Sequence, residues 1–399
     1  MHVFIITQYF PPEVGASASR WGDYTDIMLS KGHKVTVLCE MPNYPHGKIF
    51  SGYKNSWQKK EVISENFTII RSAVIANDRS TSLKKLLHYI SFAFVAIINA
   101  FKVKSYDLLI ISSPPLFVGL VGLVLNKFKK KDYWLDVRDL WPESVASLLN
   151  GKKSFYYKIG KKIESLIYTN AKGFIFPIPS FEKYLSNYPQ NINKPMISLI
   201  NGVSDKFINK ANSIKINEEN IFTVLYSGNL GYAQDLRTII DSANDLRDHK
   251  IIFKFIGNGV CKNKLESYAI NNNKIFFQDS IDRDKLIVEI RNASVCLVPL
   301  INSPLFNRAL PSKMFEYMAC SKPIIVGIKG DAKSLVELSK SGITIEPENS
   351  SMLSSAILNY FNNPAKAKKD GTNGRKYIEA NLIKKDLISS FIKKINTYD

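Results

Sequence analysis

Cysteine is scarce in this sequence of 399 residues, which holds only Cys39, Cys261, Cys296 and Cys320. None of them forms a C-x-x-C pair, and a disulfide framework needs a denser set. We therefore expect free, mostly buried thiols in a reducing compartment. The five histidines are scattered with no metal-ligand spacing, so no bound metal ion is expected.

Several common sequence signals are also missing. The N-terminus, MHVFIITQYFPP, has no basic region and its apolar run is too short for a signal peptide. No stretch reaches the roughly 18–20 apolar residues of a spanning helix. The absence of a Walker A pattern disfavours a P-loop NTPase, and GNG at 257–259 is not a complete dinucleotide fingerprint because position 262 is Lys262. No cofactor is therefore expected.

Positive charge, in contrast, is abundant. Lysine and arginine number 54 against 35 aspartates and glutamates, a formal net charge of +19, within an otherwise ordinary globular composition. Residues 1–200 hold 26 basic and 14 acidic residues, so they carry +12 of this excess. An anionic partner is indicated: a nucleic acid, a membrane surface or a phosphorylated small molecule. The N-terminal half is the more basic and therefore the better candidate for a membrane surface.

Short apolar runs alternate with segments of helical periodicity, which predicts two α/β domains with doubly wound, mostly parallel sheets. Predicted strands of the first series are 3–7, 34–39, 107–112 and 132–137, and those of the second are 222–228, 251–257, 274–277, 293–300, 322–327 and 342–346. We expect an N-terminal domain at 1–200, a polar linker at 201–220 and a C-terminal domain at 221–382. A final helix at 383–399 could return to the N-terminal domain.

Ligands of such sheets bind at the carboxyl ends of strands, so the loops there are the first candidates for chemistry. SGNLG at 227–231 follows a predicted strand and leads into a helix, where amides and a helix N-terminus favour a phosphate. An ordinary turn is the alternative. QYFPPEVGA at 8–16 has the same position in the first domain. A natural place for a ligand is the cleft between two such domains.

Two further segments carry charged residues. RALPSKMFEYMAC at 308–320 predicts a helix whose first turns present Lys313 and Glu316 on one face. They could bind a diphosphate and ribose hydroxyls, or form a surface ion pair. DVRDLWPE at 136–143 places three carboxylates beside Arg138 at a strand end, which suits acid–base or hydrogen-bonding roles or a plain ion pair. DRD at 282–284 is interpreted as a helix N-cap rather than a metal site.

Residues 86–101, LLHYISFAFVAIINAF, form the most apolar segment, with thirteen apolar residues of sixteen. As a helix it would span roughly 24 Å, short of a bilayer core of about 30 Å. Lysines flank it on both sides. It is either a helix resting on an anionic leaflet or a helix buried in the first domain.

Taken in order, the motifs resemble family 4 of the retaining nucleotide-sugar glycosyltransferases, which have the GT-B fold of two Rossmann-like domains facing across a cleft. The matching stretches are QYFPPEVGA, KGHKVTVL, LDVRDLWPE, NGV at 201–203, YSGNLGYAQDL, FIGNG and LPSKMFEYMACSKPII. They run from residue 4 to about 330. The YFPPE and DLWPE loops are most similar to the branch that builds bacterial surface polysaccharides, O-antigen and capsule included.

The resemblance implies roles for particular residues. Donor-binding positions would be Gly15, Gly228, Asn229, Gly231, Gly257, Lys313 and Glu316. Two departures stand out: the first glutamate of the family's E-x7-E motif is Arg308 here, and its usual arginine and lysine fall at Asn229 and Gln234. We therefore hypothesise that Arg308 and Lys313 neutralise the diphosphate. Near the acceptor hydroxyl, Asp139 is the first candidate, followed by Asp136 and Glu143.

The leading functional hypothesis is a glycosyltransferase acting at the cytoplasmic face of the plasma membrane, to which it is peripherally bound. It would move a sugar, with N-acetylfucosamine as one candidate, from a UDP-linked or other nucleotide-sugar donor to a polyprenyl-diphosphate-linked glycan. A GT-B nucleotide-sugar epimerase is one alternative. A basic nucleic-acid-binding protein is another, but no helix-turn-helix, RRM or zinc finger supports it, so nucleic acid is not an expected partner.

Overall fold

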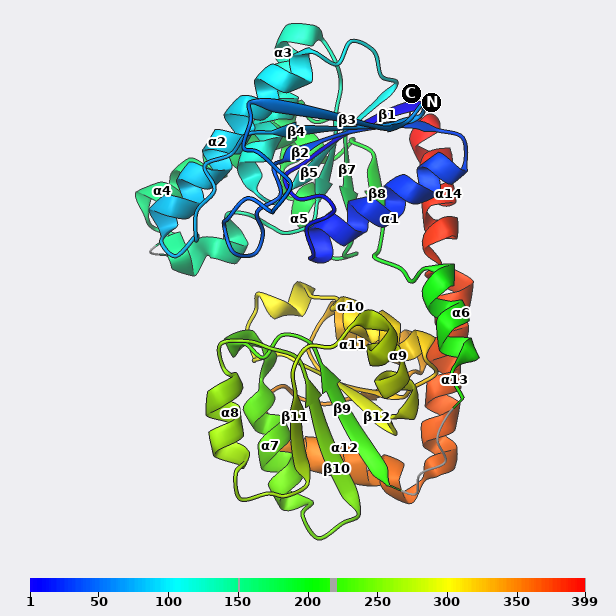
Figure 1. Ribbon diagram of the computed structural model, residues 1–399. Helices are drawn as coiled ribbons and strands as arrows, with labels where there is room; N and C mark the ends of the chain where they lie inside the picture. The colour runs from blue at the N-terminus through cyan, green and yellow to red at the C-terminus, as the bar shows by residue number, and fades with distance from the viewer. Residues whose placement is uncertain (150, 216–220, 399) are drawn as a thin grey trace. The chain divides into compact units, whose positions relative to one another are not determined.

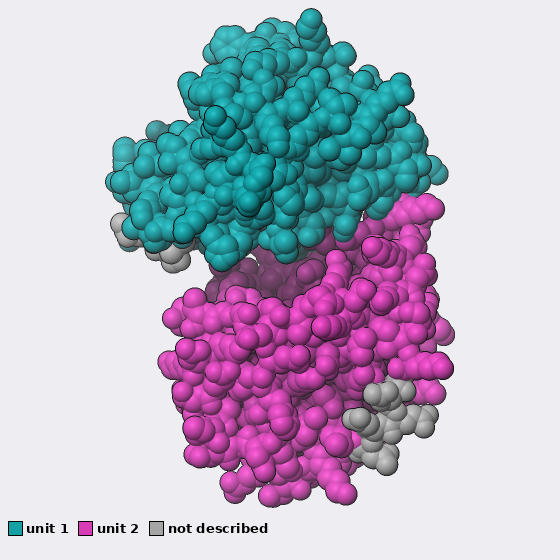
Figure 2. Space-filling model, in the orientation of Figure 1, with its two compact units in different colours: residues 1–200, 388–399 teal, residues 201–387 magenta. Residues whose placement is uncertain are grey.

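The computed structural model describes residues 1–149, 151–215 and 221–398. The chain divides into two compact units, shown in separate colours in Figure 2. Unit 1 comprises residues 1–200 and 388–399, and unit 2 comprises residues 201–387. In each unit helices flank a Rossmann-like sheet (Figure 1).

Unit 1 contains an eight-stranded sheet in the order β3-β4-β2-β1-β5-β6-β7-β8. Every neighbouring pair is parallel except β3 with β4. The strands are β1 (His2–Thr7), β2 (Lys34–Glu40), β3 (Gln58–Ser64), β4 (Phe67–Ser72), β5 (Leu108–Ser113), β6 (Trp134–Val137), β7 (Gly173–Phe176) and β8 (Met196–Ser198). The four strands predicted here are confirmed, whereas the β3–β4 hairpin and β7 were not predicted.

The helices of unit 1 cover this sheet and close its core. They are α1 (Ala16–Ser30), α2 (Ser82–Phe101), α3 (Gly119–Lys129), α4 (Phe155–Asn170) and α5 (Phe181–Ser186). Helix α14 (Lys384–Asn396) ends the chain, and its residues from 388 onward belong to unit 1. The Tyr398 ring lies 5.9 Å from that of Trp134 on β6. The chain therefore starts and ends in the same unit.

Unit 2 contains a six-stranded, fully parallel sheet in the order β11-β10-β9-β12-β13-β14. Its strands are β9 (Phe222–Ser227), β10 (Ile251–Ile256), β11 (Ile275–Gln278), β12 (Val295–Pro299), β13 (Ile324–Gly327) and β14 (Gly342–Thr344). All six were predicted, because strands buried on both faces read as continuous apolar runs. The carboxyl ends of β9, β10 and β12 meet at one edge of this sheet.

The helices of unit 2 are α6 (Asp205–Ser213), α7 (Leu236–Asp245), α8 (Lys262–Ala269), α9 (Arg283–Asn292), α10 (Ser312–Ala319), α11 (Asp331–Ser339), α12 (Ser350–Asn362) and α13 (Pro364–Asn381). The predicted linker at 201–220 needs correction, because α6 lies within it and packs Phe207, Ile208 and Ala211 into unit 2. Three apolar residues in a polar stretch were too few to predict this helix from the sequence. Residues 216–220 of that linker lie outside the described residues.

Helix α2 begins at Ser82, because the Thr81 side chain accepts a hydrogen bond from the Lys84 amide and caps it. With 20 residues it is long and apolar enough to cross a membrane by length and composition, and 39% of its most apolar window is buried. One face, including Phe92 and Ala96, packs into the core of unit 1. The opposite face is exposed, although it too is apolar.

Candidate active site

The loop after β9 is built around glycines that let it approach its neighbours closely. Gly228 has φ of +134°, and its amide donates to the Ile256 carbonyl of β10 at 2.8 Å. The Tyr226 hydroxyl donates to the Asn229 carbonyl at 2.7 Å. A Cβ atom on Gly228 would lie 2.7 Å from the Lys313 ammonium nitrogen. Two of the residues predicted to bind a donor are thus neighbours.

The loop after β10 packs backbone to backbone against the loop after β9. Gly257 has φ of +149°, and a Cβ there would overlap the Gly228 carbonyl oxygen. The Leu230 amide donates to the Asn258 carbonyl at 2.9 Å. A Cβ on Gly231 would come 2.6 Å from the Asn229 side-chain nitrogen. Of the predicted donor residues, Gly228, Asn229, Gly231 and Gly257 are therefore all in this double loop.

Lys313 lies in the first turn of α10, beside this double loop. Its ammonium nitrogen lies 3.9 Å from the centroid of the Tyr226 ring, which is a cation–π contact. Burial lowers the pKa of Lys313 to about 7, and the nearby Glu316 carboxylate opposes the shift only in part. A desolvated cation at a helix N-terminus is suited to bind an anion.

Tyr317 fixes α10 against the carboxyl end of β9. Its hydroxyl lies 2.9 Å from the Ser227 amide and 2.8 Å from the Ser227 hydroxyl, and all of these groups are buried. Sequence reasoning assigned no role to Tyr317 or to Tyr226. Both are aromatic residues in apolar segments, which gave no sign that their hydroxyls hold the loop.

Glu316, predicted to bind ribose hydroxyls, forms an ion pair of 2.9 Å with Arg283 at the start of α9. Arg283 was not among the predicted site residues. The interpretation of residues 282–284 as an N-cap is confirmed, because the Asp282 side chain accepts from the Lys285 amide at 3.0 Å. Arg308 lies exposed in the 3-10 turn Phe306–Arg308 that precedes α10. Its role stays a prediction.

In unit 1, Asp136 is fully buried at 0% exposure and is surrounded by donors. Its carboxylate accepts from Arg20 at 3.2 Å, Trp21 at 3.1 Å and Ser112 at 2.7 Å. Arg20 is also buried and donates to the Leu199 carbonyl at 2.9 Å. The prediction of a catalytic Asp136 needs correction: the structure assigns it to holding α1, β5 and β6 together.

Asp139 lies in the loop after β6 and is half-buried. One carboxylate oxygen accepts from the Leu140 amide at 2.8 Å and the other from the Ser144 hydroxyl at 2.9 Å. Burial raises the pKa of Asp139, with these hydrogen bonds opposing the shift. A carboxylate has about four acceptor positions, so it can accept a further hydroxyl. Glu143 nearby accepts from the Tyr157 hydroxyl at 2.6 Å.

Arg138 lies between these two aspartates in sequence. Its side chain donates to the Ser112 hydroxyl at 2.9 Å and to the Pro114 carbonyl at 2.8 Å. Burial lowers the pKa of Arg138 to about 10, and the Asp136 carboxylate opposes this shift. Arg138 therefore stays charged at neutral pH and braces the loop that carries Asp139.

Gly15 is the N-cap of α1 in unit 1, and its backbone is extended. A Cβ there would meet only the Tyr44 ring, at 3.6 Å, which is an ordinary contact. The structure gives no steric reason for glycine at this position. A role for Gly15 in contacting the donor stays a prediction.

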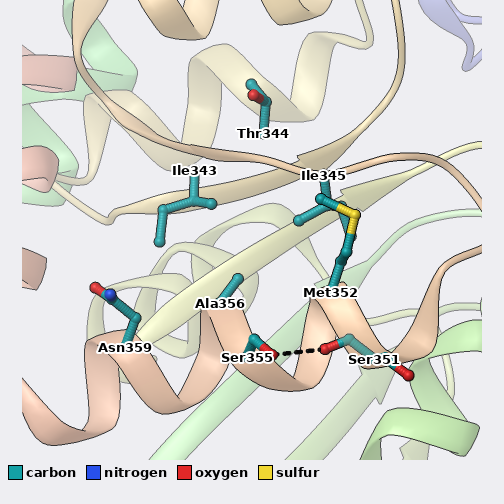
Figure 3. Close-up of a pocket in the computed structure, with 8 residues that line it drawn as sticks. All are labelled: Ile343, Thr344, Ile345, Ser351, Met352, Ser355, Ala356 and Asn359. Atoms are coloured by element: carbon teal, nitrogen blue, oxygen red, sulfur yellow. Dashed lines mark hydrogen bonds between the residues drawn. The ribbon is translucent and has the colours of Figure 1, made fainter.

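Two other kinds of site, a metal centre and a surface hollow, do not account for these residues. Among the described residues no group of three or more His, Cys, Asp or Glu could hold a metal ion. A hollow of about 380 Å³ lies between β14 and α12. Figure 3 shows the residues that line it, which are Ile343, Thr344, Ile345, Ser351, Met352, Ser355, Ala356 and Asn359. It has no charged lining residue and includes none of the loop residues above, so it does not suit a diphosphate.

Comparison with known proteins identifies the class. Residues 207–377 match the family model "Glycosyl transferases group 1". The chain is 23% identical to "Putative colanic acid biosynthesis glycosyl transferase WcaI" of Escherichia coli strain K12, over 99% of this chain and 100% of that protein. It is 22% identical to "Probable glycosyltransferase WbjE" of Pseudomonas aeruginosa, over 86% of this chain and 84% of that one.

The fold has close structural counterparts as well. The solved structure "Trehalose-6-phosphate from E. coli bound with UDP-2-fluoro glucose" superposes with a TM-score of 0.75 at 12% identity, covering 99% of this chain and 98% of that one. The predicted GT-B fold is thereby confirmed. The chain is a glycosyltransferase, and its residues 207–377 form a domain of the glycosyl transferases group 1 family.

Proposed function

We propose that the enzyme transfers a sugar, with retention of configuration, from a UDP-linked or other nucleotide-sugar donor to a polyprenyl-diphosphate-linked glycan. The observation that carries the proposal is the half-buried Lys313 side chain, whose ammonium lies over the Tyr226 ring and beside Gly228 at the start of α10. The UDP-sugar in the E. coli counterpart and the colanic acid pathway named for WcaI support the donor class and surface-polysaccharide synthesis. N-Acetylfucosamine is one candidate sugar.

The residues of the site suit the charge that develops in this reaction. As the bond between the anomeric carbon and the diphosphate oxygen breaks, the leaving nucleotide gains negative charge. Lys313, the N-terminus of α10 and the amides of Asn229 and Gly231 stabilise that charge, with Arg308 as a second cation. The acceptor hydroxyl attacks the anomeric carbon on the same face, and its proton leaves with the departing phosphate. Asp139 accepts a hydrogen bond from that hydroxyl.

The direct test is to incubate the purified enzyme with a panel of nucleotide sugars and polyprenyl-diphosphate acceptors and to read the products by mass. We expect one extended glycan, with the anomeric configuration of the donor shown by NMR. Asp139→Asn should bind UDP with unchanged Kd but turn over roughly 100-fold more slowly. Release of a free, epimerised sugar without acceptor would instead reveal an epimerase, and full turnover by Asp139→Asn would remove Asp139 from the mechanism.

We further propose that unit 1 rests on the cytoplasmic surface of the membrane through α2. Its exposed apolar side chains follow a single helical stripe, formed by Leu83, Leu86, Leu87, Ile90, Phe94, Ile98 and Phe101. The Phe94 ring, 58% exposed, meets the exposed Trp57 ring at 6.3 Å. Lys84, Lys85, Lys102 and Lys104 flank the stripe. Because the opposite face belongs to the core of unit 1, this geometry favours a helix lying on the membrane over one that crosses it.

Serine at both Leu87 and Phe94 should weaken binding to vesicles containing phosphatidylglycerol by tenfold or more, since two apolar side chains lose their lipid contact. Co-sedimentation at low and high salt measures this, and the lysines should make wild-type binding salt-sensitive. Leu338→Ser is the matched control, because Leu338 is 71% exposed on α11 of unit 2. Equal binding of wild type and the double variant would exclude this surface.

A further inference from the structure

A second cationic group lies in unit 1, among aromatic rings. We call it the tyrosine–arginine cluster, and it consists of Tyr9, Tyr44, Arg79 and Tyr89. The rings of Tyr9 and Tyr44 lie 5.5 Å apart. The Arg79 guanidinium carbon lies 6.0 Å from the first ring centroid and 5.4 Å from the second. Tyr89, on α2, is close enough to interact with both Tyr9 and Arg79. The loops after β1 and β2, the segment before α2 and α2 itself thus converge here.

Buried polar groups beneath the cluster fix its geometry. Glu13 accepts hydrogen bonds from the amides of Asn43 and Tyr44, both at 2.9 Å. The Asn43 side chain donates to the Glu40 carboxylate at 2.6 Å, and its oxygen accepts from Arg79. The position of the guanidinium is therefore set before any ligand arrives, which lowers the entropic cost of binding one.

The Glu40 carboxylate also contacts two other residues, Gln8 and His88. Glu40 accepts from the Gln8 amide at 2.6 Å and lies 3.2 Å from the His88 ring nitrogen. These groups are fully buried. The negative charge of Glu40 is thus engaged by its own partners and does not form an ion pair with Arg79.

Arg79 has features of a residue kept for binding. Its φ of +52° is uncommon for a residue with a side chain and is retained only where the surroundings enforce it. Its Nε is buried and has no hydrogen-bond partner among the described residues. In the part of the chain that the structure describes, no carboxylate pairs with it. An arginine fork with an unused donor suits a phosphate or carboxylate group.

We propose that the tyrosine–arginine cluster binds an anionic group of the acceptor, with Arg79 as the cation and the tyrosine rings as walls. This inference rests on the proposed glycosyl transfer. The diphosphate of a lipid-linked glycan is the favoured source, because α2 begins at Ser82, just after Arg79, and its exposed apolar stripe begins at Leu83. A uronic acid carboxylate in the glycan is a second source of the same chemistry.

The test compares Arg79→Gln with wild type on a short-chain prenyl-diphosphate acceptor, which stays in solution. We expect the acceptor KM to rise roughly 10- to 100-fold, as for a lost hydrogen bond to a charged group, with the donor KM unchanged. Arg79→Lys should recover part of the loss. Lys60→Gln is the control, because it removes one positive charge from an exposed side chain of unit 1 on β3, outside the cluster and the α2 stripe. Equal melting temperatures show that the variants fold.

Two further acceptors identify the source of the anion. On a neutral alkyl glycoside of the same glycan, wild type and Arg79→Gln should perform equally. If the difference appears only with a uronic acid acceptor that lacks phosphate, the anion is a carboxylate and the cluster keeps its role. The proposal would be overturned if the acceptor KM of Arg79→Gln stayed within twofold of wild type on every anionic acceptor. It would also be overturned if the KM of Arg79→Gln rose as much on the neutral acceptor as on the anionic ones.

One measurement separates failure of this inference from failure of the proposed function. Inorganic pyrophosphate is titrated by calorimetry into Lys313→Met, in which the donor site is disabled, and into Lys313→Met with Arg79→Gln. If the double variant binds pyrophosphate more weakly than Lys313→Met does, the anion site is supported even if no acceptor is ever extended. Identical binding in both counts against the site, whatever the activity assay shows.

Discussion

Replacing Lys313 by methionine is expected to weaken UDP binding roughly 100-fold and to slow sugar transfer by a similar or larger factor. The ammonium is desolvated, stacked on Tyr226 and adjacent to Gly228, so its charge acts on a bound diphosphate with little screening by water. Methionine keeps most of the side-chain volume and removes the charge. Calorimetry with UDP and steady-state kinetics measure the two effects.

The same lysine makes binding depend on pH. Its pKa in the free enzyme is lowered to about 7, so above that pH a growing fraction is neutral and must take up a proton when the anion binds. UDP affinity of the wild type should therefore fall by up to tenfold per pH unit above about 7. The terminal phosphate of UDP, with a second pKa near 6, is already ionised in this range. In Lys313→Met the profile between pH 7 and 9 should be flat.

Lys322→Met is the matched control for these measurements. Lys322 is also half-buried, its pKa is also lowered by burial, and it follows the other end of α10. UDP affinity should be unchanged in this variant. A parallel Arg308→Ala variant tests the second cation: unchanged donor affinity and turnover would defeat the hypothesis that Arg308 neutralises the diphosphate. A sloping pH profile in Lys313→Met would assign the titration to another group.

Alanine at Gly257 is expected to destabilise unit 2 by about 2–4 kcal/mol, or roughly 5–15 °C in its melting temperature. The backbone there has φ of +149°, which side chains rarely adopt, and a Cβ would overlap the Gly228 carbonyl oxygen. The double loop would have to open, so UDP affinity should fall with stability. Calorimetric unfolding with and without UDP measures both.

Gly327→Ala is the control for this substitution, at the carboxyl end of β13 in the same unit. A Cβ there would meet its nearest neighbour at 3.6 Å, an ordinary contact. Its melting temperature should change by no more than about 2 °C. If Gly257→Ala melts like this control, the close packing of the two loops does not stabilise the unit as described.

The fold was largely predictable because parallel strands buried on both faces have nearly continuous apolar sequences, such as VFIIT in β1 and IIFKFI in β10. The strand β3 was not, because it is an edge strand whose side chains include Lys59, Lys60 and Glu61. Charged residues at an edge discourage pairing with other chains, and they also hide the strand from pattern analysis. Unit 1 therefore has a sheet wider than its sequence indicates.

The site was predictable only in its loops. The carboxyl ends of parallel strands had to meet, so SGNLG and GNG could be placed together in advance. The contact of Lys313 with Gly228 and the ion pair of Arg283 with Glu316 join segments that are distant in sequence, and no local pattern encodes them. The N-cap prediction for residues 282–284 used only the two aspartates and assigned no role to Arg283 between them.

The buried carboxylate of Asp136 has a consequence for how knockouts of this enzyme are interpreted. It neutralises Arg20, and removing one partner of such a pair costs about 3–5 kcal/mol by leaving the other charge alone in the protein interior. An inactive Asp136→Ala enzyme would resemble a catalytic mutant in an activity screen, although its defect would be misfolding. Arg20→Met should give the same loss of soluble protein, whereas Asp139→Asn should yield as much folded enzyme as wild type.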